Sequence, residues 1–279
     1  MTDIGSDAER HQVPIPQHPN ARLVLGWGAF TDIGRRREHN EDSFLAQAPI
    51  FAVADGMGGH SAGDVASTAV VVRLFEGISG PFADAATIGR ALAAATTDMG
   101  LVFDAKGLGV GTTVTGAALS LRGNQPFWTV FNVGDSRVYL FERGELRQLT
   151  VDHSVVQELV DSGATSAADA QRHPDSNVIT RAVGFNVEAV PDFQVLPVRA
   201  GGRLLVCSDG LNKELPAASI RAALAAGKPA AHTARALVEA ALAAGGRDNI
   251  TTIVIDVLEC SGLGEIGYSL TDTKPIPVQ

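Results

Sequence analysis

The chain has 279 residues, of which 45% are hydrophobic, and its formal net charge is −9 at pH 7. This length allows one large domain or two small ones, and the acidic balance excludes nucleic acid and anionic lipid as expected partners, since both attract basic surfaces. No apolar run approaches the ~20 residues that span a bilayer, and the N-terminus lacks the apolar region of a signal peptide. Cys207 lies in an apolar run, which favours a buried, reduced thiol. We therefore expect a cytoplasmic protein without a membrane anchor.

The predicted elements lie between two polar ends. Residues 1–22 contain several prolines and no apolar period, which predicts a disordered arm. The elements that follow are a strand at 50–54, helices at about 63–78 and 84–104, strands at 112–121, 127–133 and 137–141, a helix at about 152–162, a strand at 204–207, helices at about 216–226 and 229–244, and a strand at 250–257. From Cys260 onward Gly, Ser, Thr and Pro dominate. We expect one domain over residues 23–258, an N-terminal arm over 1–22 and a flexible C-terminal tail over 259–279.

The spacing of the strands indicates how they pair. The runs 127–133 and 137–141 are separated only by Gly134-Asp135-Ser136, which is too short for the crossover that parallel strands need. Helix pairs alternate with these antiparallel strand blocks along the chain. The pattern therefore predicts an α+β fold of stacked sheets flanked by helices, and it excludes a doubly wound parallel sheet.

Acidic residues lie at the ends of the predicted strands. They are Glu41, Asp42, Asp55, Asp135, Asp209 and Asp248. Any one of them alone is most often a turn or capping residue. Strand ends from different parts of a sandwich can converge, however, and oxygen ligands without paired His or Cys suit Mg²⁺ or Mn²⁺. The set therefore predicts a binuclear metal site within one domain.

Such a metal pair has a specific chemistry. It lowers the pKa of a bound water and holds the oxygens of an in-line displacement at phosphorus. A phosphate dianion in the site also needs an orienting cation. Arg37, four residues before Glu41, is placed to supply a bidentate guanidinium fork, whereas Arg35 and Arg36 fit a solvated basic turn.

A second interpretation rests on Gly59-His60-Ser61-Ala62-Gly63, which matches the G-x-S-x-G elbow of α/β-hydrolases. Ser61, Asp209 and His232 even follow the chain order of a hydrolase triad, so a serine esterase using Ser61 is the alternative. Against it, the preceding strand ends near Asp55, too far before Ser61 for an elbow, and no oxyanion segment of the HGGG type precedes it. Ser61 is better interpreted as the first turn of the following helix.

The motifs taken together resemble a known family. They are Arg37-x-x-Asn40-Glu41-Asp42, Asp55-Gly56-Met57-Gly58-Gly59-His60, Gly111-Thr112-Thr113, Gly134-Asp135-Ser136-Arg137, Leu149-Thr150-x-Asp152-His153-Ser154, Ser208-Asp209-Gly210 and Asp248-Asn249. Over about residues 25–257 the chain resembles the bacterial branch of the metal-dependent protein phosphatases, the PPM or protein phosphatase 2C family. The resemblance implies a four-layer α-β-β-α sandwich that hydrolyses phosphoserine and phosphothreonine on proteins with Mn²⁺ or Mg²⁺.

The resemblance also implies roles for the acids and the partners. Asp55 would bridge two metals, Asp209 and Asp248 would hold the first, and the Gly56 carbonyl would hold the second. Glu41 and Asp42 would act near the second metal through waters. Asp135, together with Asp209, would hold a third, weaker metal. The implied partners are proteins that a serine/threonine kinase has phosphorylated in bacterial signalling. The implied oligomeric state is a monomer.

Met57 departs from the family pattern, and the segment 162–180 does not indicate which substrate is preferred. Met57 stands where animal members have a histidine, and it cannot donate a proton to the leaving alkoxide. We therefore hypothesise that His60, at the end of the same glycine-rich loop, is the catalytic acid, and a metal-bound water is the alternative donor. The segment 162–180 corresponds to the mobile flap of bacterial members, and we expect it to form a surface lid.

Overall fold

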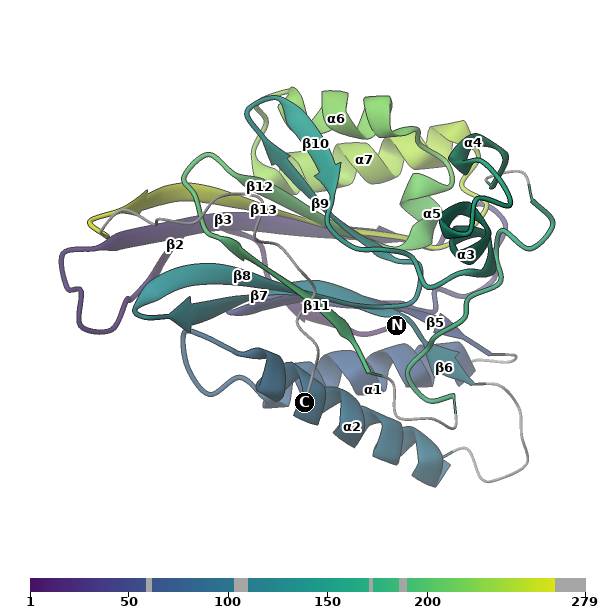
Figure 1. Cartoon of the computed structure of the whole chain (residues 1–279), viewed down its shortest axis with the longest axis horizontal. Coiled ribbons are helices and arrows are strands. Elements are labelled where there is room, and N and C mark those ends of the chain that lie inside the picture. The colour runs from purple at the N-terminus through teal and green to yellow at the C-terminus, as the bar shows by residue number, and fades with distance from the viewer. Residues whose placement is uncertain (59–61, 103–109, 171–172, 186–189, 264–279) are drawn as a thin grey trace.

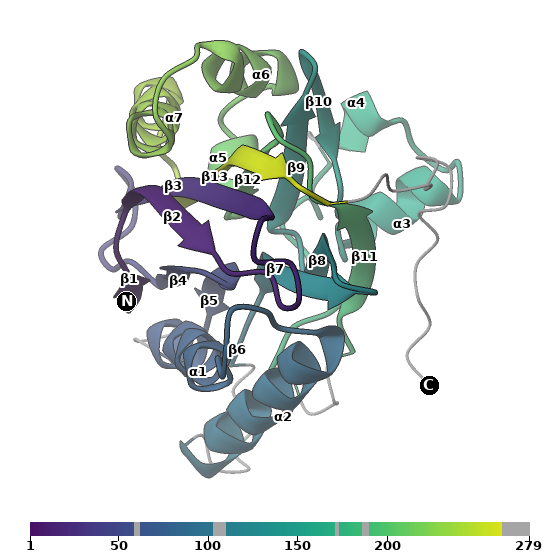
Figure 2. The same ribbon diagram turned by 90° about the vertical axis from the view of Figure 1, so that its left-hand side faces the viewer.

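The chain forms two stacked β-sheets with a pair of helices on each outer face. The computed structural model describes residues 1–58, 62–102, 110–170, 173–185 and 190–263. Viewed from the side, the order of layers is helices, sheet, sheet, helices, and a turn of 90° shows the same stacking end on (Figures 1 and 2). The predicted four-layer α-β-β-α sandwich is confirmed.

The first sheet packs against α1 (Ala62–Glu76) and α2 (Ala85–Val102). Its strands, in spatial order, are β1 (Asp3–Gly5), β4 (Asp42–Gln47), β5 (Ile50–Met57), β7 (Val114–Arg122), β8 (Gln125–Val133) and β11 (Asp192–Pro197), and the short β6 (Gly111–Thr112) pairs with the end of β5. All the strand pairs of this sheet are antiparallel except that of β1 with β4.

The second sheet packs against α6 (Ala217–Ala225) and α7 (Ala230–Ala244). Its strands, in spatial order, are β10 (Glu145–Gln148), β9 (Arg137–Glu142), β12 (Arg203–Cys207), β13 (Ile250–Ser261), β3 (Arg22–Asp32) and β2 (Ala8–Val13). Three short helices, α3 (Val155–Asp161), α4 (Ala167–Ala170) and α5 (Asp209–Asn212), lie together at one end of the sandwich (Figure 1).

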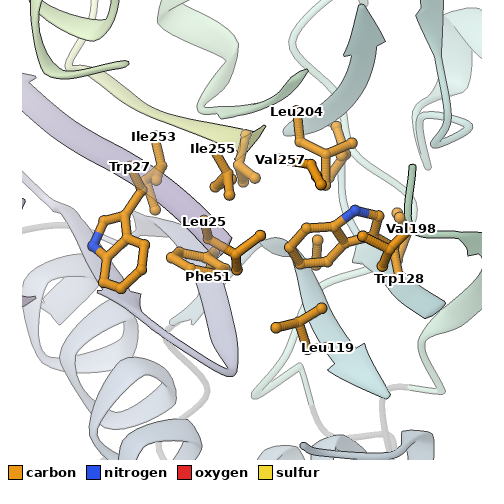
Figure 3. Close-up of a cluster of buried hydrophobic side chains, with 14 of the residues drawn as sticks. Leu25, Trp27, Phe51, Leu119, Trp128, Val198, Leu204, Ile253, Ile255 and Val257 are labelled. Carbon is orange, nitrogen blue, oxygen red and sulfur yellow. The ribbon is translucent and has the colours of Figure 1, made fainter. Parts of the chain in front are cut away.

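The core has three apolar layers, one between the sheets and one beneath each helix pair. β5 shows why its sequence reads as a continuous apolar run: Phe51 and Val53 face the other sheet, whereas Ile50 and Ala52 face α1 and α2. A strand with both faces buried has no polar alternation. Between the sheets the rings of Phe51 and Trp27 pack edge to face, with 5.2 Å between their centroids (Figure 3). The rigid sandwich thus fixes the strand ends at which the acids lie.

The N-terminal residues correct the prediction of a disordered arm. β1 pairs with β4, and β2 pairs with β3, so both strands extend a sheet edge. Val13 and Ile15 are buried between the sheets, and Trp27 Nε1 donates a hydrogen bond to the Ser6 carbonyl at 2.9 Å. The free backbone groups of two sheet edges stabilise a segment whose composition alone predicts disorder. Likewise β13 extends to Ser261, past the predicted start of the tail, and residues 264–279 lie outside the described residues.

The elements that were predicted agree closely with the structure, whereas β3, β4, β10 and β11 were not predicted. The helices predicted at about 63–78, 84–104, 216–226 and 229–244 are α1, α2, α6 and α7, and the helix predicted at about 152–162 is the shorter α3. Cys207 is buried and unpaired, as expected. Among the described helices, none combines the length and the apolarity required to cross a bilayer.

Candidate metal centre

Acids from both sheets meet at the end of the sandwich where β4, β5, β12 and β13 adjoin. Asp42 and Asp55 are direct cross-strand neighbours on β4 and β5. Asp42 Oδ2 accepts hydrogen bonds from Ser208 Oγ at 2.8 Å and from Thr251 Oγ1 at 2.6 Å. Since Ser208 follows β12 and Thr251 lies on β13, these bonds connect an acid of the first sheet to the second sheet. The convergence predicted from the strand ends is therefore present for this pair.

The remaining acids act electrostatically on this pair. Burial raises the pKa of Asp55 well above its ordinary value, and the charges of Asp42, Asp209, Asp135 and Asp248 raise it further. Burial is likewise the main cause that raises the pKa of Asp42 to about 7, and it raises the pKa of Asp135 to about 7. Buried like charges at one site disfavour ionisation unless a cation compensates them.

The donor atoms suit a hard divalent cation. The buried Oδ1 atoms of Asp42 and Asp209 have no hydrogen-bond partner among the described residues. An unpaired buried carboxylate oxygen is costly, and a metal ion would satisfy it. All the candidate ligands are oxygens, the type that Mg²⁺ and Mn²⁺ prefer. Within the described ranges, no three His, Cys, Asp or Glu side chains lie as a group that could hold a metal ion without rearrangement, and basic side chains pair with some of the carboxylates.

Two of these basic side chains are Arg37 and Lys213. Arg37 Nη2 donates to Asp248 Oδ2 at 2.7 Å, and the Arg37 side chain is 49% exposed. Lys213 Nζ forms an ion pair with Asp209 Oδ2 and lies 3.8 Å from Asp135 Oδ2. Sequence analysis missed Lys213, although its position four residues after Asp209 in a short helix is a signal for such a pair.

Asn249 positions the loop that bears the predicted phosphate ligand. Its Oδ1 accepts from the Glu41 backbone N–H at 2.9 Å, and its Nδ2 donates to the carbonyls of Ile33 and His39 at 2.8 and 3.0 Å. These bonds attach both ends of the segment around Arg37 to the start of β13. Asn249 was noted only as part of a motif, and this supporting role was not predicted.

Glycine is required at Gly56 by its neighbours. A Cβ atom there would lie 2.1 Å from the Gly63 carbonyl oxygen and 2.8 Å from that of Glu41. The Gly56 N–H donates to the Glu41 carbonyl at 3.2 Å. The end of β5, the start of α1 and the segment before β4 are thus in close contact, which places Gly56 and Glu41 beside Asp55.

A cleft of about 740 Å³ opens beside these acids. Its lining includes Arg37, Asp135, Lys213 and Asp248, together with residues of α3, α4 and the following turn, among them Asn177. The flap segment predicted at 162–180 therefore contributes to the wall of the same cleft, with residues 171–172 outside the description. A substrate in the cleft would contact both the acids and the flap.

His60 and Ser61 lie outside the described residues. The catalytic role predicted for His60 therefore stays a prediction. The other two residues of the proposed esterase triad do not form the pair that it needs. His232 is exposed on α7, on the outer face of the second sheet, and Asp209 is paired with Lys213 instead of a histidine. The triad arrangement is not supported.

An α-β-β-α sandwich with acids from both sheets at one end defines the PPM class of metal-dependent phosphatase folds. The protein phosphatase 2C family model matches residues 34–244, and the chain belongs to this family. The predicted resemblance is confirmed.

Relatives and solved structures agree with this assignment. The chain is 38% identical over 263 residues to the serine/threonine protein phosphatase PstP of Mycobacterium tuberculosis, and the match covers 91% of this chain but 48% of PstP. It is 37% identical over 243 residues to the serine/threonine phosphatase stp of Listeria monocytogenes, covering 81% of this chain and 93% of stp. The chain thus spans about half the length of its mycobacterial relatives and almost the full length of the Listeria protein.

Solved structures show the same fold. The crystal structure of the Mycobacterium tuberculosis phosphatase PstP/Ppp has a TM-score of 0.78 and 38% identity, covering 85% of this chain and 100% of the solved chain. The PstP catalytic domain in complex with two manganese ions has a TM-score of 0.77 and 37% identity, with the same coverage.

Proposed function

We propose that this chain is a serine/threonine protein phosphatase that uses two Mn²⁺ or Mg²⁺ ions. The observation that carries the proposal is the convergence of buried acids from both sheets beside an open cleft that Asp135 and Asp248 line. Two of the acids, Asp42 and Asp209, have a carboxylate oxygen that lacks a hydrogen-bond partner among the described residues. Family membership and the manganese-containing relative support the same reaction. When bound, the metal pair supplies an activated water and stabilises charge at phosphorus.

The ligand roles proposed here are those that the family resemblance implies. Asp55, whose pKa responds to the charges of the acids around it, is proposed as the bridging ligand. Asp209 and Asp248 are proposed to hold the first ion, and the Gly56 carbonyl the second. Glu41 and Asp42 are proposed to act near the second ion through waters. Asp42 is already engaged by two hydroxyl groups through one oxygen, which leaves its Oδ1 for this purpose.

Arg37 is proposed to orient the phosphate of the substrate. Its guanidinium is held on one edge by Asp248, and it lines the cleft. A planar guanidinium held in this way can present its other N–H groups to two phosphate oxygens at once. Asp248 would therefore serve both a metal ion and the group that binds the substrate.

His60 is proposed to protonate the leaving alkoxide, because Met57 cannot. A nitrophenolate departs without a proton, whereas a serine alkoxide requires one. We expect His60→Ala to slow phosphopeptide hydrolysis by ~10²-fold or more while barely changing p-nitrophenyl phosphate turnover. Equal losses on both substrates, or none on either, would assign the proton to another donor.

The proposed substrates are proteins phosphorylated by a serine/threonine kinase, and the proposed state is a cytoplasmic monomer. The net charge of −9 disfavours nucleic acid as a partner. The cleft is lined by Arg37, Arg247 and Lys213, which suits a phosphate group. Light scattering coupled to gel filtration tests the monomer, and a dimer mass would contradict it.

One experiment separates the proposed function from the esterase alternative. Phosphopeptide hydrolysis is measured with Mn²⁺, with Mg²⁺ and in excess chelator, in parallel with labelling by a fluorophosphonate probe. We expect chelation to abolish hydrolysis, Mn²⁺ to restore it, and the probe to leave Ser61 unlabelled. Full activity in chelator together with labelled Ser61 would overturn the phosphatase proposal.

A further inference from the structure

Lys213 lies between the two acids that the family resemblance assigns to a third metal ion. It follows α5, and its backbone N–H donates to the Asp209 carbonyl at 2.9 Å, so its backbone is fixed. Its ammonium group forms an ion pair with Asp209 Oδ2 and lies 3.8 Å from Asp135 Oδ2. The side chains of Asp135 and Asp209 are 8% and 9% exposed, against 31% for Lys213. The long lysine side chain thus reaches inward from the cleft to two buried carboxylates.

Lys213 brings one positive charge to two buried carboxylates. Its ammonium group has three N–H donors and no acceptor, so it suits a position between carboxylate oxygens. The chain therefore holds an internal cation beside Asp135 and Asp209.

The other basic side chains of the cleft have acidic partners elsewhere. Arg37 pairs with Asp248, Arg137 with Asp152, and Arg247 with Glu214. Among the cleft residues that the structure describes, Lys213 is thus the cation that reaches Asp135. Because the other basic side chains are paired with other acids, the contact with Asp135 is specific to Lys213 and does not reflect a generally basic cleft wall.

We propose that the Lys213 ammonium takes the place of the third metal ion between Asp135 and Asp209, so that this chain works with two metal ions and has no third site. The inference rests on the proposed function. A divalent ion and an ammonium group cannot share this position, because both need the same carboxylate oxygens and repel each other. A tethered group also has an effective concentration of the order of mM, which competes well with a weakly bound ion.

The number of bound ions tests the proposal directly. Bound Mn²⁺ is counted by following the free Mn²⁺ signal in electron paramagnetic resonance during a titration of the full chain into the mM range. We expect two ions on the wild type and on Lys213→Arg, and a third, weak ion on Lys213→Ser. Lys213→Met, which keeps the stem and removes the charge, should also gain the third ion, and it serves if the serine variant does not fold.

Two controls assign the third ion to this position. The double variant Lys213→Ser/Asp135→Ala should return to two ions, because the new site would lose a ligand. Lys228→Ser, which removes an equal charge from an exposed position, should stay at two ions. In activity measurements, Lys213→Ser should show a second rise in phosphopeptide turnover in the mM range of Mn²⁺ that the wild type lacks.

The outcomes are distinguishable. Three ions on the wild type, or two ions on both Lys213→Ser and Lys213→Met, would overturn the assignment of Lys213 and leave the phosphatase proposal intact. No Mn²⁺ binding to the wild type would overturn the proposed function and this inference with it.

Discussion

Acidic residues occur at both ends of the strand pair β12–β13, in two different environments. At one end Arg203 and Asp256 are cross-strand neighbours, and the Arg203 guanidinium donates to both carboxylate oxygens, at 2.5 and 2.9 Å. Arg203 also donates to the carbonyls of Leu224 and Lys228. At the other end, Asp42 is fully buried, and among the described residues its carboxylate is hydrogen-bonded only to hydroxyl groups, through one of its oxygens.

The difference separates a structural ion pair from a cluster of acids that lacks a counter-charge. Arg203 and Asp256 satisfy each other, so their charges need nothing from outside the chain. Around Asp42 and Asp55 the acids outnumber the bases, and burial and mutual repulsion raise the pKa of both. Such a cluster is retained at a cost in stability, which is expected where the missing cation is a cofactor. Substitutions at the two ends should therefore act on stability in opposite directions.

Asp55→Asn should have the largest effect. Loss of the bridging ligand should reduce phosphopeptide hydrolysis by ~10³-fold or more, because both ions depend on it. In chelator, the melting temperature of the variant should be higher than that of the wild type, because a neutral amide relieves the repulsion from Asp42 and Asp209. Two ions bound at wild-type affinity, measured by calorimetry, would contradict the bridging role.

Asp256→Asn is the matched change at the other end of the strands. It leaves the largely buried Arg203 without a counter-charge. We therefore expect the free energy of unfolding, measured in urea, to fall by about 2–3 kcal/mol. Phosphopeptide hydrolysis below the melting transition should stay near the wild-type rate. A stabilised Asp256→Asn, or a destabilised Asp55→Asn in chelator, would remove the distinction between the two ends.

Arg37→Lys should have an intermediate effect on the reaction. The substitution keeps the charge but loses the bidentate fork, so we expect KM for phosphopeptide to rise about 10-fold with a smaller change in kcat. The half-exposed pair with Asp248 contributes at most about 1 kcal/mol, so stability should hardly change. Arg203→Lys is the control, with lower stability and an unchanged KM. An unaltered KM in Arg37→Lys would exclude Arg37 from phosphate binding.

Most of the fold was predictable because its elements follow local rules. Helices with a clear apolar period and β-branched strands were located within a few residues. β3 was not predicted, because glycines interrupt its apolar run. A Cβ at Gly28 would lie 2.2 Å from Ala231 Cα, so the glycine lets α7 approach the sheet, a tertiary requirement that a local pattern cannot show. The N-terminal strands were missed because they depend on the edges that they extend.

The candidate site was predictable in its acids but not in its cations. An acid at a strand end is visible in a sequence, and several such ends must meet in a sandwich. The partner of each acid depends on which long side chain reaches it, and this is decided by loop geometry. Arg37 was expected to face a phosphate and contacts Asp248, while Lys213 was not considered. Supporting residues such as Asn249 are likewise visible only once the loops are in place.

His153 lies near the acidic end of the sandwich, but both of its ring nitrogens have a partner within the chain. Its Nδ1 accepts from the Gly134 N–H at 3.1 Å, and its Nε2 lies 3.1 Å from Asp192 Oδ2. The neutral ring that donates from Nε2 satisfies both contacts, whereas protonation of Nδ1 would break the first. Burial lowers the pKa of His153, opposed by the hydrogen bond to Asp192 and reinforced by the charge of Arg181.

This arrangement predicts the smallest effect, a change in the pH dependence of stability. Because the pKa of His153 is lower in the folded chain than the ~6.5 of an unfolded histidine, the unfolded state binds more protons just below pH 6.5. His153 therefore stabilises the fold fully above that pH and destabilises it as the pH falls, by at most about 1.4 kcal/mol per pH unit. His153→Asn, whose Oδ1 can still accept from Gly134, should flatten this slope in urea titrations between pH 5 and 7. Equal slopes in the two proteins would mean that His153 titrates alike in both states, and that the contacts to Gly134 and Asp192 do not select the neutral ring.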